Sequence, residues 1–407
     1  MKTVLLLATM NTKQREAALL KEYIEQAGCG CLILDCSLVE NHTPYDALRR
    51  EMLALCGVEE SALSELPKSE VHPMIQEAAG RITEKLYREG RIHGGIGMGG
   101  VQGTTIAAAA LQRLPIGVPK MLFSAVANGQ MRFGPLVGCS DMLIMHSVVD
   151  VAGSNRLIRR LLRHAGTAIA AMTEDEASDI CGTRGAVGIT MGGVTTACVS
   201  QIQEQLEQRG YEVLIFHCNG IGAQAMEALV AAGKIDAVMD ITPHDVMDWL
   251  AGGLMPAQED RYAAIRARGI PLLIAPGCAD LILFAGQKNV PAEMRNRKSV
   301  EHNELHTHVK ANYREIHALG DYLKDRLGRG ANPVAVMIPE RGFSQKNIAG
   351  GPLYEPESDR GFEDSLRDGT PGNFSLFPVD AHINDSAFAD ACVSVLIGML
   401  EKAERKE

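Results

Sequence analysis

The chain has 407 residues and a net charge of −10, and only 4% of its residues are aromatic. This length exceeds what one hydrophobic core usually serves, so two domains are expected. The acidic balance, the absence of a basic run and the single tryptophan (Trp249) argue against nucleic acid and anionic membranes as partners. An anionic ligand would have to be held locally, by loops and a few cations.

The ten cysteines are scattered through mostly apolar segments without a C-x-x-C pair, which indicates reduced core thiols in a cytoplasmic protein. The apolar residues 3–8 imitate a signal peptide, but polar residues 11–15 follow at once and no small-residue cleavage site separates them. A first β-strand is therefore expected there. The longest charge-free runs are too polar to span a membrane.

Apolar runs that alternate with helical periods predict a βαβ series, and hence a parallel sheet, in each half of the chain. In the first half we expect strands at 3–8, 32–36, 119–124 and 142–145, a further strand at the start of 94–105, and helices at 14–26, 74–89, 106–113 and 154–172. In the second half we expect strands at 186–190, 213–217, 236–241, 271–275 and 334–338, and helices at 197–208, 224–232, 304–327 and 386–402.

The predicted fold is therefore α/β, with two Rossmann-like, doubly wound parallel-sheet domains at residues 1–180 and 184–407. The boundary is expected near residues 178–184, after an acidic, polar stretch. Polar or glycine-rich turns follow six successive apolar runs of the second half, namely its five strands and residues 377–379, and in a doubly wound sheet such turns share one edge. We expect a ligand cleft where that edge faces the first domain.

Two glycine turns repeat one pattern, an apolar strand followed by glycines, two threonines and a helix. Glycine permits close backbone approach, and a helix start offers free N–H groups and a positive dipole end, so each turn is a candidate phosphate site. Neither turn is a P-loop, and the first misses the dinucleotide fingerprint by one residue. A tight strand ending is the alternative reading. With a third turn at 220–222, the candidate contacts are Gly192, Gly193, Val194, Thr195, Thr196, Gly220, Ile221, Gly222, Gly99, Gly100, Gly103 and Thr104.

Several acidic residues follow predicted strands directly. Asp280 and Asp385 are candidate ligands of the Mg²⁺ that would accompany ATP, and Asp240 is a candidate for either metal binding or catalysis. An ordinary turn or cap role is the alternative for each. His244 and Asp245 stand where the N-cap of a helix is expected.

Residues 301–308 read E-H-N-E-L-H-T-H and are the most metal-like string in the chain. If they began the helix at 304–327, His302 and His306 could share one face. The H-E-x-x-H order is missing, and a polar helix start is the simpler reading, so we predict no transition metal here. His302 is a candidate general base, because the ordinary histidine pKa near 6.5 suits proton transfer at neutral pH. His382 is a further catalytic candidate.

Taken together, these turns resemble a known family, the ATP-binding domain of the tomato mosaic virus resistance protein and its bacterial relatives. The resemblance implies two Rossmann-like subdomains, binding of ATP with a divalent ion, and assembly into a homodimer or larger homo-oligomer. The plant relative blocks viral RNA replication, a role that we do not transfer. The matching stretches span nearly the whole chain in order: 9–13, 97–105, 149–155, 191–196, 220–227, 239–242, 302–303 and 382–385.

Two positions depart from the family pattern. Val300 stands where relatives tend to carry a histidine, and Val309-Lys310 stands where they tend to carry Met-Arg. A lysine lacks the bidentate fork of a guanidinium group, which leaves the anionic partner of Lys310 open.

The leading expectation is that ATP and Mg²⁺ bind on the second-half glycine turns and serve an ATP-dependent or phosphate-handling enzyme. Its substrate would be a small organic acid or sugar acid. One alternative is a non-catalytic, nucleotide-regulated binding module. Another is a metal-assisted lyase or hydrolase that uses the histidine cluster without a nucleotide.

Overall fold

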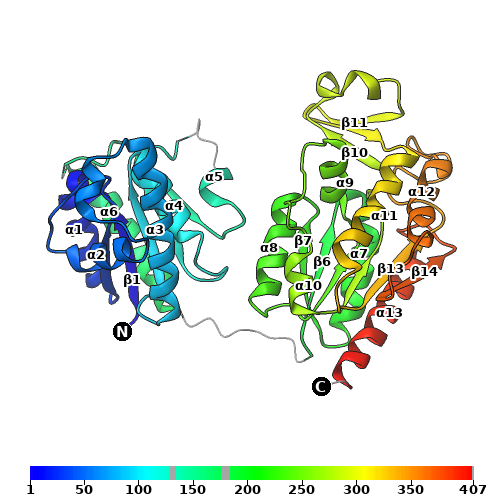
Figure 1. Ribbon diagram of the computed structural model, residues 1–407, viewed down its shortest axis with the longest axis horizontal. Coiled ribbons are helices and arrows are strands. Elements are labelled where there is room, and N and C mark those ends of the chain that lie inside the picture. Colours follow the sequence, from blue (N-terminus) through cyan, green and yellow to red (C-terminus); the bar gives the residue numbers. More distant parts are fainter. Residues whose placement is uncertain (129–133, 154, 176–183, 406–407) are drawn as a thin grey trace. The chain divides into compact units, whose positions relative to one another are not determined.

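The structure, a computed structural model, describes residues 1–128, 134–153, 155–175 and 184–405 (Figure 1). The chain divides into two compact units, Met1–Ser178 and Asp179–Glu407. The boundary predicted near residues 178–184 therefore lies almost wholly outside the described residues.

The first unit is built on a five-stranded sheet with strand order β2-β1-β3-β4-β5, in which every pairing is parallel. In β1, Leu5 and Leu7 enter the core on one face while Val4 and Leu6 enter the core on the other, because side chains alternate along a strand. The strands are β1 (Thr3–Ala8), β2 (Gly30–Asp35), β3 (Gly94–Gly99), β4 (Lys120–Ser124) and β5 (Leu143–His146).

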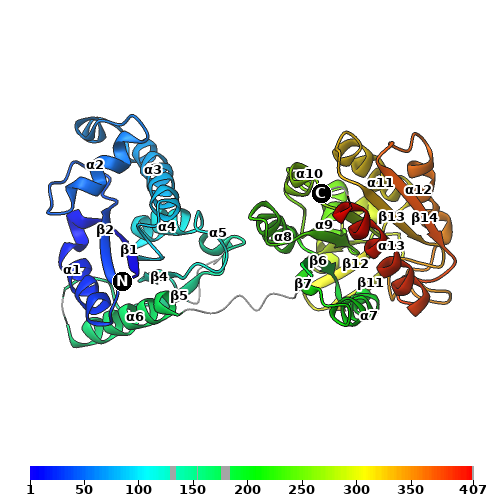
Figure 2. The ribbon, with the colours of Figure 1, turned by 90° about the horizontal axis from the view of Figure 1, so that it is seen from below.

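Helices cover both faces of this sheet (Figure 2). Helices α1 (Met10–Gln26) and α6 (Arg156–Glu174) pack together over one face. The other face carries α2 (Asp46–Ala54), α3 (Lys68–Arg88) and α4 (Val101–Leu111), with the single turn α5 (Gly134–Val137) beside α4.

The second unit has a six-stranded parallel sheet with strand order β14-β13-β9-β8-β6-β7. Its strands are β6 (Ala186–Met191), β7 (Glu212–His217), β8 (Ala237–Asp240), β9 (Leu272–Ile274), β13 (Val334–Pro339) and β14 (Phe374–Val379). One face packs against α7 (Thr196–Glu207) and α13 (Ser386–Glu404). The other face packs against α8 (Gly220–Ala231), α9 (His244–Ala251), α10 (Ala263–Arg268), α11 (Tyr313–Leu327) and α12 (Pro356–Arg367).

A small antiparallel sheet belongs to the second unit, with strand order β10-β12-β11. Its strands are β10 (Leu281–Phe284), β11 (Ser299–Asn303) and β12 (His306–Lys310). The predicted helix at 304–327 is therefore wrong in its first part, because α11 begins only at Tyr313. There Asn312 and Glu315 form a capping box that fixes the start. In β12, buried Thr307 and Val309 alternate with partly exposed histidines, which is the two-residue period of a strand.

The expected α/β fold with two parallel, doubly wound sheets is confirmed. In both sheets the first strand lies between the second and the third, so the winding reverses between β1 and β3 and again between β6 and β8. Ligands of open α/β sheets bind outside the carboxyl ends of the strands at this switch point. The fold thus marks one candidate position in each unit. A cleft between the units stays a prediction.

Candidate functional site

A cavity of about 330 Å³ lies at the switch point of the second unit. Its volume is near the lower end of the ~300–1,000 Å³ usual for ligand pockets. Its walls come from the turns after β6, β7 and β9, from the first residue of α9, and from the small antiparallel sheet. Five histidines and two cysteines face it. The lining residues are Gly192, Gly193, Val194, His217, Cys218, His244, Met255, Cys278, Leu281, Leu283, His302, Asn303, His306 and His308.

The turn after β6 is held by its own threonines. The Gly192 N–H donates to Thr195 Oγ1 at 3.1 Å, and this buried hydroxyl also contacts Thr242 Oγ1 at 2.8 Å, which ties the turn to the end of β8. The Thr196 hydroxyl donates to the Gly193 carbonyl at 3.1 Å. Neither threonine lines the cavity, whereas Gly193 does and would meet nothing within 4 Å if it carried a Cβ. The open backbone at Gly193 is thus the part of the turn left to a ligand, whereas the Val194 carbonyl already accepts hydrogen bonds from the Gln345 N–H (3.0 Å) and the Asn384 amide (2.9 Å).

Gly192 has a different role, because it makes room for two sulfur atoms. A Cβ on Gly192 would stand 2.8 Å from the Sγ of Cys218 and 3.3 Å from the Sγ of Cys278. Cys278 reaches this point because the loop after β9 crosses the end of β8, where the Gly277 N–H donates to the Ile241 carbonyl at 3.0 Å. Cys278 itself has a φ of 58°, an uncommon backbone conformation for a residue with a side chain.

The pKa values of two histidines of the cavity are shifted in opposite directions. His308 accepts a hydrogen bond on Nδ1 from Lys346 Nζ at 2.9 Å, and burial, with the positive charge of Lys346, lowers its pKa to about 3. It is therefore neutral at physiological pH. His244 is buried with Nε2 3.5 Å from Asp248 Oδ2. Burial opposes its protonation, but Asp248 and Cys218 together raise its pKa.

This arrangement places a neutral imidazole and a more basic one on the same small cavity. Such a pair can accept and donate protons, and the more basic ring favours an anionic ligand. His302 completes the group, because its ring stacks on that of His308 with centroids 5.1 Å apart.

Asp240 and His382, two predicted catalytic residues, lie elsewhere and hold the fold together. Asp240 is fully buried and accepts hydrogen bonds from Thr190 Oγ1 (2.6 Å), Arg261 Nη2 (2.6 Å) and Tyr262 OH (2.7 Å). His382 accepts from the Asn384 N–H on Nδ1 (3.1 Å), so its Nε2 carries the proton that it donates to the Ser344 carbonyl at 3.0 Å. Neither side chain lines the cavity.

The predicted magnesium ligands are not brought together as a set. Asp280 is buried and accepts from Ser344 Oγ at 2.7 Å, while its Oδ1 has no hydrogen-bond partner among the described residues. Asp385 is exposed at the start of α13 and accepts the His382 N–H at 2.8 Å. Over the described ranges, no group of three or more His, Cys, Asp or Glu side chains is arranged to hold a metal ion.

The third glycine turn owes its glycines to packing. A Cβ on Gly220 would lie 2.0 Å from the Pro256 carbonyl oxygen, and one on Gly222 would lie 2.2 Å from that of His217. The Gly222 N–H also caps α8 by donating to Asn219 Oδ1 at 2.7 Å, and Ile221 is exposed. None of these three predicted contacts lines the cavity.

Sequence reasoning missed His217, Cys218, His244 and Cys278 as cavity residues. Their signal was their place just after β7, β8 and β9, at the edge where ligands bind. His244 and Asp245 were instead predicted as an N-cap. In the structure α9 begins at His244 after Pro243, and Asp245 pairs with Arg261 at 3.1 Å.

The first unit has its own cavity of about 560 Å³ at its switch point, where α1, α3 and α4 begin. Of the predicted contacts, Gly100 and Gly103 line it, and Gly100 faces open space. Gly99 and Thr104 have internal roles, because Gly99 abuts Gly103 and the Thr104 hydroxyl contacts Ser124 Oγ at 2.6 Å. The cavity is lined by Thr9, Asn11, Thr12, Lys13, Leu38, Val39, Lys68, Gly100, Val101, Gln102 and Gly103.

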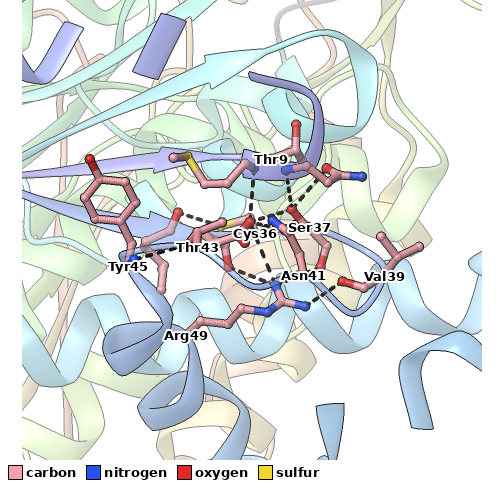
Figure 3. A network of polar contacts seen from close by, with 12 residues as sticks. Thr9, Cys36, Ser37, Val39, Asn41, Thr43, Tyr45 and Arg49 are labelled. Atoms are coloured by element: carbon pink, nitrogen blue, oxygen red, sulfur yellow. Dashed lines mark hydrogen bonds and ion pairs between the residues drawn. The ribbon is translucent and has the colours of Figure 1, made fainter. Parts of the chain in front are cut away.

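A polar network holds the loops around this first cavity (Figure 3). Asp35, at the end of β2, accepts the Met10 N–H at 3.0 Å and the Asn41 amide at 2.9 Å. The fully buried Arg49 donates to the carbonyls of Ser37 and Val39, each at 2.9 Å. The network therefore fixes both the start of α1 and the loop after β2, which form opposite parts of the cavity wall.

Fold and cavities define a two-unit α/β protein whose parallel sheets each carry a ligand-sized cavity at the switch point. None of the helices in the described ranges is long and apolar enough to cross a membrane. The chain belongs to the uncharacterised protein family UPF0261, whose N-terminal domain matches residues 2–178 and whose C-terminal domain matches residues 184–400. The resemblance noted from the sequence is thereby confirmed at the level of the family.

Relatives match over nearly the whole chain. A UPF0261 protein of Clostridium tetani is 32% identical and covers 98% of this chain and 100% of its own. The ToMV resistance protein Tm-1(GCR237) of Solanum lycopersicum is 35% identical over 78% of this chain, and the match spans 43% of the tomato protein. Among solved structures, UDP-GlcNAc 2-epimerase from Neisseria meningitidis bound to UDP-GlcNAc is 11% identical, covers 67% of this chain and 82% of its own, and has a TM-score of 0.23. No argument rests on that last likeness.

Proposed function

We propose that the second unit binds a nucleotide, ATP with Mg²⁺, with its phosphates in the 330 Å³ cavity. The observation that carries this proposal is the open backbone at Gly193, at a helix start, facing a cavity lined by five imidazoles. Backbone N–H groups at a helix start attract phosphate, and the imidazole of His244, whose pKa is raised, adds to that attraction. ATP is the nucleotide that the family resemblance implies.

The cavity also favours chemistry over binding alone. His244 and His308 have opposite tendencies to hold a proton and face the same space. We therefore propose an ATP-dependent or phosphate-handling enzyme with a small organic or sugar acid as substrate. The geometry of Asp280 and Asp385 does not offer a joint metal site, so Mg²⁺ would be held mainly by the phosphate oxygens.

Titration calorimetry with MgATP tests the binding step. Gly193→Val should abolish binding, because the valine side chain would enter the space that a phosphate would use, and its Cβ meets no protein atom within 4 Å. Gly372→Val is the matched control, since Gly372 also faces open space but lies outside both switch points. The control should bind like the wild type.

Undiminished MgATP binding by a folded Gly193→Val protein would refute this site. The first unit would then be tested in the same way with Gly100→Val, because Gly100 also opens on a cavity at a helix start. Loss of binding in Gly100→Val alone would assign the nucleotide to the first unit.

Measuring ATP turnover distinguishes an ATP-dependent enzyme from a non-catalytic binding module. Incubation with ATP and a panel of sugar acids should release ADP or phosphate, and His302→Ala should slow that release by roughly a hundredfold or more, as expected for loss of a general base. Tight binding of ATP without any consumption across the panel would favour the non-catalytic module.

A further inference from the structure

Two thiols in the wall of the second-unit cavity, those of Cys218 and Cys278, lie on either side of Gly192. Cys218 follows β7 and Cys278 follows β9, strands that are separated in the sheet by β8 and β6. They meet because the loop after β9 crosses the end of β8 and because Gly192 has no side chain between them. Both sulfur atoms lie beside the position that a Cβ on Gly192 would take, 2.8 Å from it for Cys218 and 3.3 Å for Cys278.

The surroundings of this pair differ from those of an ordinary core thiol. Both cysteines face the cavity, so a small solute in the cavity reaches them although each is only 3–4% exposed. His217 and His244 line the same cavity, and both act to lower the pKa of the Cys218 thiol. Reactive cysteines occupy electropositive sites that a reagent can enter, whereas buried thiols in apolar surroundings are inert.

We propose that Cys218 and Cys278 are a reversible, peroxide-sensitive thiol pair, with Cys218 as the attacking residue. This goes beyond the proposed nucleotide site and does not depend on it. The positive φ of Cys278 is consistent with a backbone held in an unusual conformation at a functional position.

Charge assigns the two roles. The hydrogen bond from Cys278, with help from His217 and His244, lowers the pKa of Cys218 against the effect of burial. The same hydrogen bond, with burial, raises the pKa of Cys278. Cys218 is thus the better thiolate and Cys278 the resolving thiol.

The chemistry balances with hydrogen peroxide as oxidant. The Cys218 thiolate attacks one peroxide oxygen, the O–O bond breaks, and the hydroxide that leaves takes a proton from a neighbouring imidazolium to become water. The Cys278 sulfur then attacks the sulfenic sulfur, the S–O bond breaks, and a second water leaves with the Cys278 proton. Two thiols are oxidised to one disulfide and the peroxide is reduced to two waters. A dithiol reductant reverses the step.

Peptide mapping after peroxide treatment tests the proposal. The full-length protein is exposed to hydrogen peroxide, free thiols are alkylated, and the protein is digested without reduction. We expect a cross-linked peptide pair containing Cys218 and Cys278 that dithiothreitol separates. Cys198 and Cys392 are the internal control, because they are neighbours in the apolar core below α7 and α13. Their cross-link should form at least about tenfold more slowly.

Single substitutions test the two roles. Cys278→Ser should leave a sulfenic acid on Cys218 that dimedone traps, and Cys218→Ser should leave Cys278 unlabelled under the same conditions. If either variant fails to fold, the wild-type mapping decides alone. Absence of the Cys218–Cys278 link, or linkage no faster than that of Cys198 and Cys392, would overturn the proposal.

MgATP distinguishes this inference from the proposed function. Protection of the pair by MgATP would support both. Cross-linking that MgATP leaves unchanged would uphold the thiol pair and count against the nucleotide in this cavity.

Discussion

The rings of His302 and His308 stack with centroids 5.1 Å apart and an angle of 14° between their planes. The two residues are not direct partners in the sheet, because Val300 is paired with His308. His302 lies at an irregularity of β11, between Glu301 and Asn303, where the register shifts. A bulge of this kind redirects a side chain. Here the ring of the exposed His302 lies on the ring of His308.

This position makes His308 a source of acid sensitivity. Its pKa is lowered to about 3 by burial and by Lys346, whereas the unfolded chain takes up this proton near pH 6.5. The unfolded state therefore binds more protons between these values, and the free energy of unfolding falls as pH is lowered through that window. Denaturation at pH 7 and pH 5 should show a smaller loss for His308→Gln than for the wild type, by up to about 1.4 kcal/mol per pH unit.

His42→Gln is the control for that measurement, because the His42 side chain is 76% exposed. It should keep the wild-type difference between the two pH values. An equal loss of unfolding free energy between pH 7 and pH 5 in His308→Gln and in the wild type would show that the folded protein does not hold His308 neutral.

Elemental analysis should find no stoichiometric zinc, iron or manganese in the purified protein. Lys346 hydrogen bonds to His308 Nδ1, and the His302 ring covers one face of the His308 ring. The three histidines at 302, 306 and 308 are therefore not arranged as a set of metal ligands. The double variant His306→Ala with His308→Ala should retain the metal content of the wild type. About one tightly held transition metal per chain, lost in that variant, would favour the metal-assisted alternative.

Arg261 should be among the most sensitive positions for stability. It is buried and pairs with Asp240 at 2.6 Å, Asp245 at 3.1 Å and Glu227 at 3.1 Å. Arg261→Met would leave the buried carboxylates of Asp240 and Asp245 without their cation. It should lower the free energy of unfolding, measured by chemical denaturation, by about 3–5 kcal/mol. Arg341, whose pair with Asp380 is exposed, is the matched control, and Arg341→Met should leave the midpoint near that of the wild type. Similar midpoints for the two variants would contradict a structural role for the Arg261 cluster.

Gly192→Ala should destabilise the second unit because its methyl group would press on the Cys218 sulfur. Overpacking of this kind costs about 1–3 kcal/mol. Cys218→Ala in the same chain should recover part of that loss, and a double-mutant cycle measures the coupling. Additive effects of Gly192→Ala and Cys218→Ala on the free energy of unfolding would mean that contact with the Cys218 sulfur is not what destabilises the Gly192→Ala variant.

Much of the fold could be predicted from the sequence, because parallel strands are continuous apolar runs. Residues 3–8 were predicted and observed as a strand with the same bounds, and β6 differs from its prediction by one residue. The failure at 304–327 has a physical cause. The polar residues 301–308 look like a helix start in one dimension, but they form two antiparallel strands because β12 pairs with β11 on one side and with β10 on the other.

The site was harder to predict because it depends on crossings between loops. The glycine turn was recognisable from local pattern and Gly193 lines the cavity, whereas Thr195 serves its own turn. Cys278 could not be placed without knowing that its loop crosses the end of β8. The sequence left the anionic partner of Lys310 open. In the structure this partner is Asp359, whose carboxylate lies 2.6 Å from the Lys310 ammonium group.

The strand order of the two sheets has a consequence for synthesis of the chain. The first sheet is complete once β5 has emerged at His146, whereas the second needs β14, which ends at Val379. At ~5–20 residues per second, the ribosome takes on the order of 10–50 s to make the intervening segment. Once β8 has been made, at Asp240, 139 residues remain up to Val379, so β6, β7 and β8, with the glycine turn and Cys218, lack the edge strand of their sheet for roughly 7–28 s at that rate. We therefore expect the chain to depend most on chaperones while its second unit is being synthesised, and its thiols to be most exposed to oxidants at that stage.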